Sequence, residues 1–277
     1  MKNLPVDLQD KYEKLQNIFR EMESALIAMS GGVDSVVMAK VACDVLGESA
    51  LAVTADSPSL PRRELAQTLK LARDHHIHHR LIQTEELQDE RYVANPANRC
   101  YFCKDELFNH LDSLLEERGY QWVCYGENLD DRGDFRPGSL AAQEHRVRAP
   151  LKEASFNKND VRSLAQYLGL PIWDKPASAC LASRIPYGQQ VTPEKLAQVE
   201  AAEDYLWELG FRQFRVRHHG DIARIELAPD QMLQMLEDAP SVNAHLKMMG
   251  FKYVAMDLTG YRRGSLNEGI VTTLEDL

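Results

Sequence analysis

The chain has 277 residues, of which 44% are hydrophobic, and its 32 basic and 42 acidic residues give a net charge of −10. This length suits one large domain or two medium ones with a substantial core. The negative charge provides no general attraction to nucleic acid, and no apolar run approaches the roughly 18 residues of a membrane span. The polar first residues do not resemble a signal peptide, so we expect a cytoplasmic protein with no nucleic-acid or membrane partner. Its five cysteines should then bind metal or take part in catalysis rather than form disulfides.

Apolar periodicity and turn residues predict alternating strands and helices over the first two thirds of the chain. Helices are expected at 8–22, 34–46, 61–75, 98–118 and 158–169, and strands at 25–29, 51–55, 78–83 and 121–125. This alternation is typical of an α/β fold with a doubly wound parallel sheet. After the Pro-, Ser- and Gly-rich segment 171–191, which resembles a linker, we expect helices at 192–209 and 229–249, a hairpin of 211–218 and 221–227, and a strand at 251–258. The sequence therefore predicts an α/β domain at 1–185 and a small α+β domain at 186–277.

The loop 30–35, which reads Ser30-Gly31-Gly32-Val33-Asp34-Ser35, is the most informative motif of the chain. It lies between the first expected strand and a helix, where backbone N–H groups and the helix dipole favour an anion such as a phosphate. Asp34 fits such a site if a metal ion bridges it to the phosphates, or if it caps the helix. The loop is too short for a Walker A loop and lacks the Gly-Lys-Ser/Thr ending. It matches the loop of the ATP pyrophosphatases, which cleave ATP to AMP and pyrophosphate; the alternative is an ordinary tight turn.

Two other polar segments follow expected strands. Asp56 ends the second strand, and the loop 126–131, which begins at Gly126, follows the fourth. Ligands of doubly wound sheets bind at the carboxyl ends of the strands. We therefore expect Asp56, Gly126 and the 30–35 loop to share one ligand site.

Three cysteines could bind a metal. Cys100 and Cys103 share one face of an expected helix, and Cys180 lies in the irregular segment 171–191. Three thiolates without an obvious fourth ligand suggest a 4Fe-4S cluster with one open iron, whereas zinc would need a fourth ligand. Unrelated buried thiols remain the alternative. Cys43 and Cys124 lie in apolar segments and are expected in the core.

Four segments of the chain together resemble the LarE family, ATP-dependent sulfur transferases that make the nickel-pincer nucleotide cofactor of lactate racemase. The segments are 30–35, 126–131 with 134–138, 176–188 and 214–226. The first marks the wider ATP pyrophosphatase superfamily, and the last two are more specific to LarE. The resemblance spans nearly the whole chain and implies an adenine nucleotide alpha hydrolase-like PP-loop domain. It also implies a homo-oligomer, because family members form hexamers.

The resemblance implies a two-step reaction that uses ATP and Mg²⁺. A carboxylate of pyridinium biscarboxylic acid mononucleotide attacks the α-phosphate of ATP and releases pyrophosphate, and a sulfur nucleophile then displaces AMP. By the same resemblance, the expected catalytic residues are Asp34, Cys180, Arg184 and Glu203. The expected nucleotide-binding residues are Ser30, Gly31, Gly32, Val33, Asp34, Ser35, Asp56, Gly126, Arg215 and Arg217.

The sulfur source divides the family. One type sacrifices a single cysteine, and the other holds a 4Fe-4S cluster on three cysteines, here Cys100, Cys103 and Cys180. Ungapped comparison puts the sacrificial position at Ala179, which favours the cluster type for this chain. Glu226 matches a family position linked to metal binding between subunits, although an exposed glutamate in a hairpin needs no function.

Other readings of the sequence remain open. Arg215 and Arg217 alternate along a strand and suit a phosphate or carboxylates, but they could also form a solvated strand face. A tRNA thiolase and an ammonia-using adenylating ligase also carry PP-loops. The acidic balance and the lack of a recognisable RNA-binding extension argue against the thiolase, and the ligase would leave the three cysteines without a role. A nucleotide-binding regulatory protein is the non-enzymatic alternative.

Overall fold

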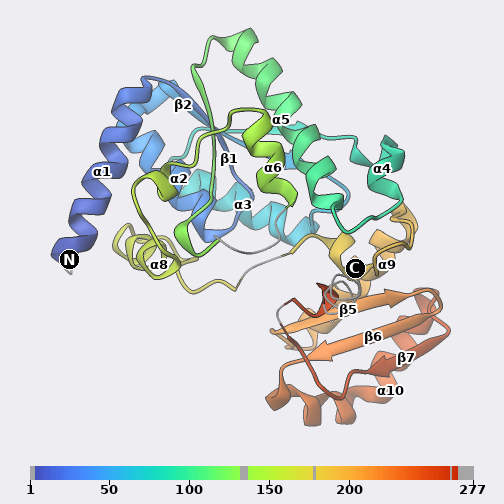
Figure 1. Cartoon of the computed structure of the whole chain (residues 1–277). Helices are drawn as coiled ribbons and strands as arrows, with labels where there is room; N and C mark the ends of the chain where they lie inside the picture. The colour runs from blue at the N-terminus through green and yellow to red at the C-terminus, as the bar shows by residue number, and fades with distance from the viewer. Residues whose placement is uncertain (1–3, 132–136, 177–178, 263, 268–277) are drawn as a thin grey trace, which may run out of the picture. The chain divides into compact units, whose positions relative to one another are not determined.

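The computed structural model describes residues 4–131, 137–176, 179–262 and 264–267 (Figure 1). The chain divides into two compact units, 1–86 with 98–178 and 87–97 with 179–277, which we call the first and second units. The predicted division into domains 1–185 and 186–277 stays a prediction. Within the described ranges, no helix is both long and apolar enough to cross a bilayer. Residues 134–136 and 177–178, which belong to two segments of the family resemblance, lie outside the described residues.

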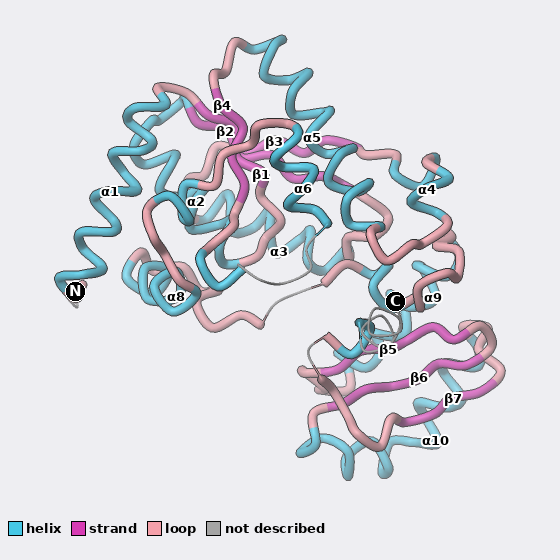
Figure 2. The backbone as a smooth tube through the Cα atoms, in the orientation of Figure 1, coloured by secondary structure: helices cyan, strands magenta, loops and turns pink. Residues whose placement is uncertain are grey.

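The first unit is built on a parallel sheet with strand order β3-β2-β1-β4 (Figure 2). Its strands are β1 (Ala25–Ala28), β2 (Ala50–Asp56), β3 (His79–Gln83) and β4 (Trp122–Tyr125). Its helices include α1 (Val6–Met22), α2 (Val33–Leu46), α3 (Arg62–Asp74), α5 (Arg99–Arg118), α6 (Pro137–Glu144), α7 (Pro150–Glu153) and α8 (Lys158–Tyr167). Because β1 pairs with both β2 and β4, the loop after β1 lies in the middle of the carboxyl edge of the sheet.

The sheet is covered by helices on both faces. Alternate strand residues point to opposite sides, so Ala25 and Ile27 pack with α1, α2 and α8, while Leu26 and Ala28 pack with α5 and α6. All of β1 is buried as a result. A strand buried on both faces is typical of a parallel sheet, and the predicted doubly wound α/β fold is confirmed.

The second unit carries a three-stranded sheet with order β5-β6-β7. β5 (Phe214–His219) and β6 (Ile222–Leu227) form the predicted antiparallel hairpin, and β7 (Tyr253–Met256) pairs in parallel with β6. Phe214, Val216 and Ile225 form one core with α9 (Pro193–Glu208) and α10 (Met232–Met248). Strand alternation then places Arg215, Arg217 and Glu226 on the other face of the sheet.

The segment 171–191 differs from the expected linker. It contains the 3₁₀ helix η4 (Leu181–Arg184), in which Leu181, Ala182 and Arg184 are buried. The short helices α4 (Glu90–Val93), α6 and α7 were not predicted either. Helices of four to eight residues cover only about one to two turns, so their apolar residues show too little periodicity to be recognised.

Asn95 fixes the loop that follows η4. Its fully buried side chain donates from Nδ2 to the carbonyl oxygens of Ile185, Pro186 and Gln189, at 3.2, 2.8 and 2.9 Å. Its own carbonyl accepts a hydrogen bond from the backbone N–H of Gly188 at 2.9 Å. One side chain therefore ties the segment 87–97 to a loop about 90 residues later.

Replacing Asn95 by Asp should lower the free energy of unfolding by about 3 kcal/mol or more, because a carboxylate would face three carbonyl oxygens without a proton to donate. Asp tolerates the positive φ of 55° at this position almost as well as Asn, so the backbone conformation is preserved. Urea denaturation of Asn95→Asp measures the loss, with Asn243→Asp on the exposed face of α10 as the control. A loss below about 0.5 kcal/mol, the size of an ordinary surface change, would contradict this role of Asn95.

Candidate functional site

The 30–35 loop turns tightly between β1 and α2. Gly31 has a φ of +79°, which a glycine adopts without strain, and a Cβ there would lie 2.1 Å from Thr68 Oγ1. Ser35 Oγ donates to the carbonyl of Gly32 at 3.0 Å and accepts from Ser30 N–H at 3.1 Å. The hydroxyl oxygens of Ser30 and Ser35 are 3.3 Å apart. The loop thus folds back on the first turn of α2, where the helix dipole attracts an anion.

Asp34 projects from the first turn of α2, next to Val33. The N-cap of this helix is Gly32, so Asp34 is not the capping residue. Its Oδ1 accepts a hydrogen bond from Asn128 Nδ2 at 3.0 Å, and its Oδ2 pairs with Lys158 Nζ. The carboxylate is therefore held beside the anion-binding loop, where a bridging cation would be needed for it to act on phosphates.

The structure brings Gly126 against the 30–35 loop. A Cβ at Gly126 would lie 2.9 Å from the backbone nitrogen of Ser35, so only glycine allows this approach. Asp56, at the end of β2, pairs with Arg62 and accepts from Gln83 Nε2 at 2.9 Å. Burial raises the pKa of Asp56, but the bonds from Arg62 and Gln83 outweigh it and hold the pKa below its ordinary value. Its part in nucleotide binding stays a prediction.

Two lysines at this site were not expected from the sequence. Lys158, the first residue of α8, contacts Asp34, and Lys175 Nζ lies 2.6 Å from Glu64 Oε2 and 3.4 Å from the carbonyl oxygen of Gly31. They stand 124 and 144 residues after the loop residues that they contact. No local spacing could have revealed them, because only the packing of the sheet and its helices brings them to the loop.

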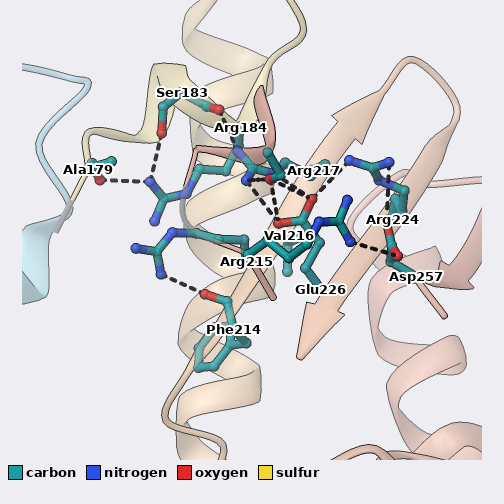
Figure 3. Close-up of polar contacts among 12 residues, drawn as sticks. Ala179, Ser183, Arg184, Phe214, Arg215, Val216, Arg217, Arg224, Glu226 and Asp257 are labelled. Carbon is teal, nitrogen blue, oxygen red and sulfur yellow. Dashed lines mark hydrogen bonds and ion pairs between the residues drawn. The ribbon is translucent and has the colours of Figure 1, made fainter. Parts of the chain in front are cut away.

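The second unit holds a separate cluster of arginines and glutamates (Figure 3). Arg184 and Glu203 form a two-pronged pair, Nε to Oε1 and Nη2 to Oε2, both at 2.9 Å. Both side chains are buried, with exposed fractions of 3% and 7%. Burial raises the pKa of Glu203, but the charge and hydrogen bonds of Arg184 outweigh it and lower the pKa below its ordinary 4.5. Arg184 Nη1 also donates to the carbonyl oxygens of Ala179 and Cys180, at 2.7 and 3.0 Å, and so fixes the backbone at Cys180.

A second buried pair joins Arg217 and Glu226, at 3.0 Å between Nε and Oε1 and 2.8 Å between Nη2 and Oε2. Glu226 is 1% exposed and also accepts from Arg224 Nη2 at 2.9 Å, so its expected exposure is wrong. Arg217 Nη1 donates to the carbonyl oxygen of Ser183 at 2.8 Å. These bonds connect β5 and β6 to η4 within the second unit, rather than forming a solvated strand face.

Arg215 lies on β5 next to Phe214, and Figure 3 shows its guanidinium group on the same side as that of Arg184. It donates from Nη1 to the carbonyl oxygen of Phe214 at 2.6 Å, and its guanidinium lies 5.1 Å from the ring of Tyr261. Burial lowers the pKa of Arg215, and the neighbouring charge of Arg184 lowers it further. An arginine whose charged form is disfavoured by its surroundings gains from a bound anion, which makes this face a candidate site for a phosphate or carboxylate.

The cysteines differ in exposure. Cys43 and Cys124 are buried, as expected for core residues, and burial raises the pKa of both thiols. Cys100 is exposed and Cys103 half-buried, both near the start of α5 in the first unit, while Cys180 is half-buried beside η4 in the second. In the described part of the chain, no three His, Cys, Asp or Glu side chains are grouped to hold a metal ion. The 4Fe-4S cluster therefore stays a prediction from the three cysteines and the family resemblance.

Replacing Glu203 by Gln should reduce the free energy of unfolding by about 3–5 kcal/mol at pH 7, because it leaves the buried Arg184 charge without its partner. The lowered pKa of Glu203 means that its stabilisation is present above about pH 4.5 and is lost as the pH falls through its folded-state value. The difference between wild type and Glu203→Gln should therefore shrink on acidification. Denaturant unfolding from pH 7 to pH 3 measures this difference. Glu208→Gln, an exposed change on the same helix, is the control, and a gap independent of pH would disprove the ion-pair origin.

We compared the sequence with known proteins to find relatives of this chain. No family model matches the sequence. The chain is 38% identical to the pyridinium-3,5-bisthiocarboxylic acid mononucleotide synthase of Lactiplantibacillus plantarum, over 94% of this chain and 95% of that protein. It is 49% identical to an uncharacterized protein of Synechocystis sp., over 94% and 98% of the two chains. A shorter match, 29% identical, covers 64% of this chain and 55% of the tRNA-specific 2-thiouridylase MnmA of Xanthobacter autotrophicus.

The match to the Lactiplantibacillus plantarum synthase runs through both units and includes the 30–35 loop and the arginine cluster. At this identity and coverage the two proteins share a fold and an ancestry, and the chain is homologous to an ATP-dependent sulfur-inserting enzyme. The chain belongs to the LarE-related family of PP-loop ATP pyrophosphatases.

Proposed function

We propose that this protein adenylates a carboxylate of pyridinium-3,5-biscarboxylic acid mononucleotide with ATP and then converts the adenylate to a thiocarboxylate. The single observation that carries the proposal is the 38% identity, over nearly the full length, to a synthase named for the bisthiocarboxylic product. The anion-binding loop supports the first step, because a site built for pyrophosphate suits the release of that group from ATP.

The chemistry suits the residues of the first unit. A carboxylate is a poor electrophile, and adenylation turns it into a mixed anhydride with AMP as the leaving group. Ser30, Ser35 and the loop N–H groups would stabilise the charge of the departing pyrophosphate. Asp34 would hold Mg²⁺ next to the phosphates, and the ion would supply electrostatic stabilisation of the leaving group.

The arginine cluster of the second unit supports binding of the anionic nucleotide substrate. Arg215 would gain from a bound anion, since burial and the charge of Arg184 lower its pKa. Arg184 and Arg217 form buried ion pairs with Glu203 and Glu226. They would therefore shape the site and contribute charge rather than move toward the substrate. Guanidinium groups bind carboxylate and phosphate through paired hydrogen bonds, which fits a substrate that carries both groups.

For the sulfur step we propose that Cys100, Cys103 and Cys180 are the functional thiols. They are the three cysteines with accessible side chains, whereas Cys43 and Cys124 are buried. A 4Fe-4S cluster bound to three thiolates would keep one iron open and supply a sulfide nucleophile there. The absence of a cysteine at Ala179 argues against a sacrificial thiol at the family position.

A tRNA thiolase is the second candidate, favoured by the partial match to the tRNA-specific 2-thiouridylase. Both candidates activate an acceptor with ATP before sulfur is added. The net charge of −10 gives this chain no general attraction for tRNA, so the nucleotide acceptor is preferred. A hexameric assembly remains part of the proposal, and size-exclusion chromatography with light scattering tests it.

The proposed reaction predicts that pyrophosphate forms only when the biscarboxylate mononucleotide is present with Mg²⁺ and ATP, and that AMP is released only when the protein also carries the sulfur. With a sulfur-loaded protein, mass spectrometry should show replacement of a substrate oxygen by sulfur. Unfractionated tRNA serves as the competing acceptor in parallel reactions. Product formation with tRNA, and none with the mononucleotide, would replace the proposal by the thiolase candidate.

The proposed thiol set predicts about four irons and matching acid-labile sulfide per chain after purification without oxygen. Cys180→Ala should lose most of this iron, because a cluster held by two thiolates is poorly retained. Cys43→Ala, which removes a buried thiol, should keep it and so serves as the matched control. Iron at background in the wild type, together with sulfur transfer and mass loss from one cysteine, would show a sacrificial thiol instead.

A further inference from the structure

The two lysines beside the 30–35 loop are both bound to carboxylates. Lys158 pairs with Asp34, and Lys175 pairs with Glu64 while lying 3.4 Å from the carbonyl oxygen of Gly31. The pairs are only partly buried, with side-chain exposures of 33% and 18% for Lys158 and Asp34. For Lys175 and Glu64 the values are 16% and 15%. Partly hydrated ion pairs are weak enough for a better ligand to break them.

The surroundings of Lys158 anchor its backbone and leave its side chain able to turn. Asn157 before it forms a capping box with Asp160, and the N–H of Lys158 donates to Asp130 Oδ2 at 2.9 Å. These bonds fix the start of α8 next to the loop. The ammonium group stands on a flexible four-carbon chain, so it can change partners without a change in the fold.

The positions of the two ammonium groups fit a polyphosphate. The loop already offers N–H groups and a helix dipole to an anion, and each lysine lies beside a loop residue, Asp34 or Gly31. Each lysine charge is neutralised by a carboxylate in this structure. Asp34, in turn, is blocked from a metal ion while it holds Lys158.

We propose that Lys158 and Lys175 are the pyrophosphate-binding cations of this site and that ATP binding exchanges their partners. On binding of ATP, both lysines turn from Asp34 and Glu64 to the β- and γ-phosphates, and Asp34 becomes available to Mg²⁺. Mg²⁺ therefore binds with the polyphosphate and not alone. This inference rests on the proposed use of ATP, and it adds two ligands and an order of binding to it.

Titration calorimetry of the full chain with inorganic pyrophosphate and Mg²⁺ tests the lysines directly. Lys158→Gln and Lys175→Gln should each weaken pyrophosphate binding about tenfold or more, while AMP binding changes less than about threefold. Lys158→Arg keeps the charge and should retain most of the affinity. Lys70→Gln, which removes the surface pair of Lys70 and Asp74 on α3, is the matched control and should bind as wild type does. Circular dichroism and thermal melting confirm that each variant is folded.

A double-mutant cycle in Mg²⁺-free buffer tests the exchange of partners. Asp34→Asn releases Lys158 and should tighten pyrophosphate binding about threefold or more, and the gain should disappear in the Lys158→Gln background. Equal effects of Asp34→Asn in both backgrounds, or Lys158→Gln binding within about twofold of wild type, would overturn the inference.

The same titrations separate this inference from the proposed function. If the wild-type chain binds neither ATP nor pyrophosphate, the proposed function and the inference fail together. If it binds both, and the lysine variants bind equally well, the inference fails and the proposed function stands.

Discussion

The pairing of β1 with a parallel strand on each side is the constraint on which the first unit depends. It buries β1 on both faces and puts the chain reversal after Ala28 at the middle of the carboxyl edge. Four backbone N–H groups at the start of α2 cannot bond within the helix, so this reversal provides donors for an anion. Gly31 and Gly126 let the backbone approach Thr68 and Ser35 closely at this point. The candidate anion site is thus a consequence of the strand order and of two glycines.

Carboxylates and cations are paired in both units, but the degree of burial differs. Lys158 with Asp34 keeps side-chain exposures of 33% and 18%, whereas Arg184 with Glu203 has 3% and 7%. Water screens the first pair, so replacing one partner of the pair by a ligand costs little free energy. The second pair is desolvated, and breaking it would leave a buried charge without a partner. A partly exposed pair such as Lys158 with Asp34 suits groups that exchange their partner for a ligand. A buried pair such as Arg184 with Glu203 suits groups that hold a loop in place.

The loop that carries Cys180 is held by several independent bonds within the second unit. Arg184 binds the carbonyl oxygens of Ala179 and Cys180, Arg217 binds that of Ser183, and Asn95 binds the backbone beyond η4. A thiol on so constrained a backbone samples few positions, which would lower the entropy lost in the metal binding or sulfur transfer that we propose for Cys180. This restraint gives the irregular segment 171–191 a physical role.

Local patterns in the sequence determined the element types, the parallel α/β sheet, the hairpin of the second unit and the tight strand–helix turn at 30–35. Strand and helix periods, glycines at a strand–helix turn and buried apolar runs act over a few residues and can be read directly. The ends of β1, α2 and α5 agree with the expected ranges to within two residues for this reason.

Only the tertiary structure decided which charged groups meet. Lys158 reaches Asp34 across 124 residues, and Asn95 reaches Ile185 across 90. The hairpin pattern predicted that Glu226 is exposed. It is buried instead, because Arg217, Arg224 and Ser265 enclose it. Such contacts depend on how helices and strands pack, and the sequence around each residue carries no spacing that specifies a distant partner. The sequence by itself thus determined where the candidate site lies in the fold, and packing decided which side chains meet there.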